Sequence, residues 1–107
     1  AFTAAGGLLR HRPDFVFCCN DRLAEGLLHR CRRDRVTPPA VVGFDNAPVA
    51  EQLGLTTVGI PWREFVSASA EVIVRRLAGD RSVARRQIFT PLPVLRSSHR
   101  PGGPRSQ

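Results

Sequence analysis

The chain has 107 residues, 42% of them hydrophobic, and 16 basic residues against 9 acidic ones give a net charge of +7. This length allows one modest hydrophobic core. No apolar run approaches the roughly 18–20 residues that a membrane-spanning helix needs, so no membrane segment is expected. All 16 basic residues are arginines, scattered without interleaved aromatic residues. This favours a solvated basic surface over the alternative, a nucleic-acid interface.

The cysteines predict free thiols in a reducing compartment. Cys18 and Cys19 are adjacent, and Cys31 makes the count odd, which argues against a disulfide framework. No Cys-x-x-Cys pair occurs, and the three histidines do not add the spacing of a metal site. We therefore expect no metal, no cofactor and a cytoplasmic location.

The chain begins with a predicted helix over residues 2–11. The continuous apolar run Phe15–Cys19 is typical of a strand buried on both faces. Asn20 and Asp21 then give a capping signal. Apolar residues at helical spacing after this pair predict a helix over about 22–33.

The central part of the chain predicts two more strands and a long helix. Ala40–Phe44 and Leu55–Val58 are the strands, and the segment 48–54 between them is expected to be irregular or helical. An apolar stripe predicts a helix over about 62–78, which Gly79 closes.

Two further short strands are predicted, Gln87–Thr90 and Pro93–Arg96. The alternation of strands and helices indicates an α/β fold, a three-layer sandwich with a mostly parallel sheet. The folded domain is expected over residues 1–98. The Pro/Gly-rich residues 99–107 are expected to form a disordered tail.

Two carboxylates follow predicted strands, at the edge where open α/β sheets bind ligands. Asp21 follows the first strand, and a fixed carboxylate can accept hydrogen bonds from the vicinal hydroxyls of a sugar. The alternative role for Asp21 is a helix cap. Asp45 follows the second strand, and its alternative role, with Asn46, is a turn.

Trp62, the only tryptophan, opens the long predicted helix. It is a candidate wall that stacks on a ligand, and core packing is the alternative. Catalytic signals are absent, since there is no Gly-x-Ser-x-Gly elbow and no phosphate-binding glycine loop. His11 and His29 lie on basic stretches away from the carboxylates. No catalytic residue and no enzyme activity are expected, although an enzyme of unknown type stays an alternative.

Four segments in unbroken order resemble the sensor domains of lactose-repressor (LacI/GalR) type regulators. Residues 13–26 are similar to P-D-A-V-F-x-x-N-D-x-x-A-x-G, and residues 41–46 to V-V-G-F-D-D/N. Residues 55–58, followed by Pro61 and an aromatic residue, resemble L-T-T-V-x-x-P. The ending resembles L-P-x-x-L-V-x-R-x-S, which extends the likeness to about residue 98.

This resemblance implies a fold of two lobes with a ligand cleft between them, as in periplasmic sugar-binding proteins. It implies that Asp21 hydrogen-bonds a small-molecule effector, a sugar or a nucleobase-like compound, and that Trp62 lines the cleft. Asn20 and Asp45 are implied to lie close by. Ile60 departs from a stretch that is often polar in the family, which leaves the effector's identity open.

The resemblance also implies that the chain is only part of a protein. In the family a helix-turn-helix domain, outside this chain, contacts operator DNA, and most of the first lobe precedes the matching region. The intact protein is expected to be a homodimer. A periplasmic solute-binding protein of the same fold is the alternative function.

Overall fold

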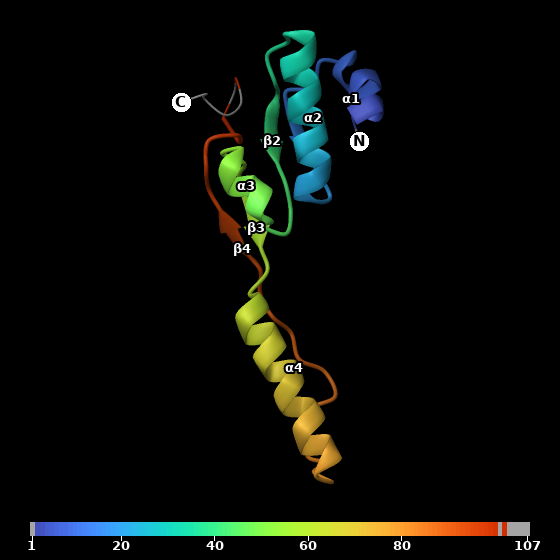
Figure 1. The fold of residues 1–107 in the computed structure, drawn as a ribbon, viewed down its shortest axis with the longest axis vertical. Helices are drawn as coiled ribbons and strands as arrows, with labels where there is room; N and C mark the ends of the chain where they lie inside the picture. Colours follow the sequence, from blue (N-terminus) through green and yellow to red (C-terminus); the bar gives the residue numbers. More distant parts are fainter. Residues whose placement is uncertain (1, 101, 103–107) are drawn as a thin grey trace. The chain divides into compact units, whose positions relative to one another are not determined.

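The computed structural model describes residues 2–100 and 102. The chain divides into two units. The first contains the described residues up to Gly59 and from Pro93 onward, and the second contains residues 60–92. In chain order (Figure 1) the elements are α1 (Phe2–Leu9), β1 (Phe15–Phe17), α2 (Asp21–Asp34), β2 (Ala40–Val42), α3 (Pro48–Gln52), β3 (Thr57–Gly59), α4 (Trp62–Leu77) and β4 (Leu92–Val94).

Strands β1 and β2 pair in parallel, as the sequence predicted. Residues 15–17 of β1 lie opposite residues 40–42 of β2. Isolated parallel bridges, one of them between Val42 and Thr56, extend the pairing from β2 toward β3. β4 pairs with β3. The two strands whose ends were expected to hold a site, β1 and β2, therefore lie side by side.

Helix α2 begins one residue earlier and ends one residue later than predicted. Asn20 is the N-cap, and its side-chain oxygen accepts a hydrogen bond from the backbone N–H of Leu23 at 2.9 Å. The C-cap is Arg35, which follows the last helical residue and adopts a left-handed conformation with φ of 56°. The capping signal in the sequence therefore marks the true start of the helix.

The core of the first unit lies between α2, the strands and α3. The apolar face of α2 supplies a row of side chains at helical spacing, as its sequence predicted. α1 packs against α2 (Figure 1), with Ala5 buried in the same core. The buried members are Ala5, Cys18, Ala24, Leu27, Leu28, Cys31, Val41, Ala50 and Leu55.

A buried serine near the end of the described chain joins β2 to β3. Ser98 is 0% exposed, and its hydroxyl donates to the backbone oxygen of Val41 at 2.6 Å. The same hydroxyl oxygen accepts from the backbone N–H of Thr56 at 2.7 Å. These bonds satisfy one acceptor and one donor that burial would otherwise leave unpaired.

The predicted tail starts at His99, whose Nδ1 atom lies 2.6 Å from the Thr56 hydroxyl oxygen. Residues 101 and 103–107 of that tail lie outside the described residues.

The second unit contains α4, with Gly79 just beyond its end at φ of 86°. The helix matches the predicted span of 62–78 to within one residue. The strand predicted at 87–90 is wrong, because these residues form no strand in the structure. Phe89 instead packs edge-to-face on Phe65 of α4, with ring centroids 5.4 Å apart. The apolar side chain of Phe89 therefore packs against α4 instead of belonging to a strand.

Candidate functional site

The first unit brings two of the predicted strand ends together. The backbone N–H of Asp21, at the start of α2, donates to the backbone oxygen of Phe44 at 3.0 Å. Phe44 lies just beyond β2 and just before Asp45. The Asn20-Asp21 pair and Asp45 therefore share one edge of the sheet, at the carboxyl ends of its strands, as expected for an open α/β fold.

Asp21 is 1% exposed, and its carboxylate is held by two donors of its own chain. Oδ1 accepts from the hydroxyl of Thr57 at 2.6 Å, and Oδ2 accepts from the backbone N–H of Ala47 at 2.7 Å. The carboxylate thus ties the start of α2 to β3 and to the segment before α3. A contact between Asp21 and an effector stays a prediction.

Helix α2 is capped by Asn20 and not by Asp21, for which a cap was the alternative role. Asn20 is half-buried and caps α2 through its side-chain oxygen. Asp21 stands in the first turn of the helix, where a negative charge interacts favourably with the helix dipole.

Asp45 and Asn46, which follow β2, have unusual backbone geometry. Their φ values are 104° and 54°, in a region that asparagine and aspartate tolerate better than most residues. The backbone N–H of Asp45 donates to the oxygen of Val58 at 2.9 Å, and Asp45 forms an isolated parallel bridge with Gly59, which attaches it to β3. Asp45 is half-buried and Asn46 is exposed. The structure assigns neither residue to a turn, in contrast to the predicted alternative role, and both polar residues lie at the same edge.

Sequence analysis missed Thr57 and Arg96, which organise this edge. Thr57 is fully buried and supplies the hydroxyl that holds Asp21. One terminal nitrogen of Arg96, Nη1, donates to the backbone oxygen of Leu55 at 2.8 Å, and the other, Nη2, donates to Asn46 Oδ1 at 3.0 Å. The available signal was the pair of threonines inside an apolar strand, because a buried hydroxyl needs a partner.

Trp62 lies in the second unit, where it begins α4 and is 53% exposed. Its indole meets the ring of Phe65 edge-to-face, with centroids 5.9 Å apart. The contact is part of an aromatic chain that continues to Phe89. The role of Trp62 as a wall of the effector site stays a prediction.

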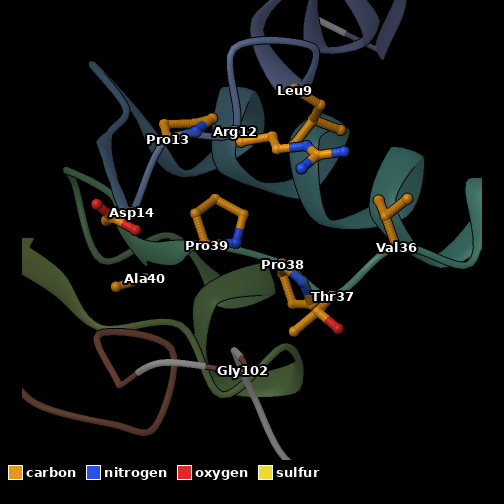
Figure 2. Close-up of a pocket in the computed structure, with 10 residues that line it drawn as sticks. All are labelled: Leu9, Arg12, Pro13, Asp14, Val36, Thr37, Pro38, Pro39, Ala40 and Gly102. Carbon is orange, nitrogen blue, oxygen red and sulfur yellow. The ribbon is translucent and has the colours of Figure 1, made fainter.

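Two open cavities of the described residues lie away from these candidates. One, of about 360 Å³, is lined by residues that precede β1 and β2, including Arg12, Asp14 and Pro39 (Figure 2). It therefore lies at the amino end of these strands, opposite the predicted edge. The other, of about 370 Å³, lies between α4 and residues 84–89. Neither is lined by a predicted site residue.

The cysteines are free thiols. Burial raises the pKa of the Cys18 thiol, and the neighbouring Cys19 and Asp21 charges raise it further. Burial likewise raises the pKa of Cys31. Both groups are therefore poor nucleophiles at neutral pH.

Within residues 2–100 and 102, no cluster of three or more His, Cys, Asp or Glu side chains could hold a metal ion. No helix in the described part of the chain combines the length and apolar character that crossing a membrane requires.

Comparison with known proteins identifies similar chains. The family model for the periplasmic binding protein-like domain matches residues 2–99. The HTH-type transcriptional repressor PurR of Vibrio cholerae serotype O1 (strain M66-2) is 36% identical over 89 residues, which are 78% of this chain and 26% of the repressor. The chain thus spans about a quarter of that relative's length.

Solved structures have the same fold. A LacI family transcriptional regulator from Arthrobacter sp. FB24, in complex with lactose, is 29% identical, with a TM-score of 0.79 over 91% of this chain and 40% of that one. A LacI family regulator from Enterococcus faecium, with bound ribose, is 24% identical, with a TM-score of 0.85 over 94% of this chain and 39% of that one.

These matches confirm the predicted α/β class and the resemblance found in the sequence. The chain belongs to the periplasmic binding protein-like domain family, of the kind found in LacI-family transcriptional regulators.

Proposed function

We propose that this chain is the effector-sensing part of a transcriptional regulator and that a sugar binds at the carboxyl ends of β1, β2 and β3. The observation that carries the proposal is the convergence of Asn20, Asp21 and Asp45 on one sheet edge. Carboxylates and amides are the groups that hydrogen-bond sugar hydroxyls. The lactose and ribose in the two similar regulators support a sugar as the effector class.

In this proposal Asn20 and Asp45 contact the effector directly. Asp21 contributes when an effector hydroxyl replaces the Thr57 hydroxyl on its carboxylate, an exchange of one donor for another at the same oxygen.

The intact protein would couple effector binding to operator DNA. We propose a homodimer in the cytoplasm that contacts DNA through a helix-turn-helix domain outside this chain, and no enzyme activity. Effector binding would shift the dimer between two states with a coupling of about 1–3 kcal/mol. The regulators among the similar proteins favour this function over that of a periplasmic solute-binding protein.

Calorimetry tests the proposal on this chain joined to a complete first lobe, with D-ribose and lactose as probes. Asp21→Ala should weaken the binding of whichever sugar binds by about 1.5–3 kcal/mol, the scale of a hydrogen bond to a charged group. Asp14→Ala is the matched control, because Asp14 is an exposed carboxylate that precedes β1. Circular dichroism must show that both variants fold. An unchanged affinity in a folded Asp21→Ala variant contradicts the role of Asp21, and no binding of either sugar contradicts the proposed effector class.

A further inference from the structure

The side chain of Asn46 has a fixed orientation at the proposed effector edge. Its amide faces the guanidinium of Arg96, with 3.0 Å between Oδ1 and Nη2. Arginine only donates hydrogen bonds, so the amide atom next to it must be the oxygen. The amide nitrogen, with its two N–H groups, therefore points away from Arg96.

Arg96 is itself held in place, so it can act as a rigid support. Nη1 donates to the oxygen of Leu55 at 2.8 Å, and its backbone N–H donates to the hydroxyl oxygen of Thr56 at 2.9 Å. On the other side, the backbone N–H of Asn46 donates to the hydroxyl oxygen of Thr57 at 3.3 Å. The backbone of Asn46 has a φ of 54°. An exposed amide held at both its backbone and its side-chain oxygen is preorganised for binding.

The neighbouring carboxylates cannot donate a hydrogen bond, whereas the amide nitrogen of Asn46 can. Ionised Asp21 and Asp45 only accept hydrogen bonds, which suits the hydroxyl groups of a sugar. The ring oxygen of a cyclic sugar has no proton and needs a donor. The amide nitrogen of Asn46 is such a donor on the same edge.

We infer that Asn46 is a specificity-determining residue that donates a hydrogen bond to the ring oxygen of a cyclic sugar, with Arg96 as its positioning residue. This inference rests on the proposed function, because it needs an effector at this edge. It adds a residue that the sequence analysis assigned only to a turn.

Asn46→Asp separates the binding role from a structural one. Aspartate tolerates the same positive φ and still pairs with Arg96, but it replaces the amide donor with an acceptor. We expect the affinity of Asn46→Asp for D-ribose to fall by about threefold to tenfold, which corresponds to the loss of one hydrogen bond. Asn46→Ala should lose less than Asn46→Asp, since it adds no charge that repels the ring oxygen. Gln52→Ala, at an exposed site on α3, is the control.

The experiment is an NMR titration of this chain joined to a complete first lobe, with D-ribose and with D-ribitol, which lacks a ring oxygen. In the unchanged chain, ribose should shift the side-chain amide signal of Asn46 and bind more tightly than ribitol. Asn46→Asp should remove that preference. Arg96→Lys keeps the charge but not the forked geometry, and it should remove the ribose response of the Asn46 amide while Asn20 still responds.

Ribose shifts at Asn20 and Asp45 without a shift at Asn46, or equal ribose affinity of Asn46→Asp and the unchanged chain, overturn this inference alone. An absence of ribose shifts at all three residues overturns the proposed site together with the inference.

Discussion

Replacing Thr57 by valine removes one buried hydroxyl and nearly preserves the shape of the side chain. The hydroxyl donates to Asp21 Oδ1 at 2.6 Å, and the two residues are 0% and 1% exposed. Valine has no hydroxyl to donate, so the carboxylate loses one of its two partners within the chain. A hydrogen bond to a charged group contributes about 1.5–3 kcal/mol. We expect Thr57→Val to lower the free energy of unfolding by about that amount.

Urea unfolding followed by circular dichroism measures the effect. With an m-value of about 2 kcal/mol/M, the midpoint should fall by about 1 M. Thr37→Val is the control, because Thr37 is exposed and should change little. A double-mutant cycle with Asp21→Asn isolates the pair, and the coupling should exceed about 0.5 kcal/mol. A loss no larger than that of Thr37→Val, or additive effects in the cycle, would show that the hydroxyl does not hold the carboxylate.

Three further predictions concern single positions. Asn20→Ala should cost about 1 kcal/mol in urea unfolding by removing the cap of α2, whereas Asn20→Asp should restore most of it. Gly43→Ala should lower stability by about 1–3 kcal/mol or more, since its new methyl group would overlap Asp21 Oδ1; an unchanged midpoint would contradict the packing. Hydrogen bonds from the side chain and backbone of Ser82 lower the pKa of Asp80 from 3.8 to about 2. The unchanged chain should therefore be more stable than Asp80→Asn above pH 3.8, and this difference in stability should disappear as the pH falls through about 2. A difference in stability that does not depend on pH would be inconsistent with the lowered pKa.

The helices were predictable because their signals are local. An N-cap at Asn20 and an apolar face at helical spacing define α2, and Gly79 marks the end of α4. Both helices match their predicted spans to within one residue. Parallel pairing also followed from the alternation of elements, although the strands are shorter than the apolar runs that contain them.

The failed strand at 87–90 shows where local patterns are insufficient. Gln87–Thr90 has an apolar centre, but a strand also needs a neighbouring strand to pair with its backbone. In the described chain these residues lie against α4, and Phe89 finds its partner there in Phe65. Whether a segment forms a strand depends on the segment that lies next to it in the fold. A single sequence does not show which segment that is.

The same limit applies to the candidate site. The order of strands and the Asn20-Asp21 pair predicted the correct sheet edge. The partners of Asp21 come from residues 26 and 36 positions further along the chain, and those of Asn46 from 11 and 50 positions. No periodicity or spacing rule connects such distant residues, so Thr57 and Arg96 were found only in the structure.

The hydrogen bonds of Ser98 constrain the order in which parts of this chain can fold. Its hydroxyl bonds connect it to residues 42 and 57 positions earlier, so closing them requires most of the chain to be present. Contacts of such high contact order slow folding, since long loops must close before the contacts stabilise anything. During synthesis the strands β2 and β3 would exist without their buried serine until residue 98 had left the ribosome. We expect the pairing of β2 with the segment before β3 to become stable only after this serine emerges.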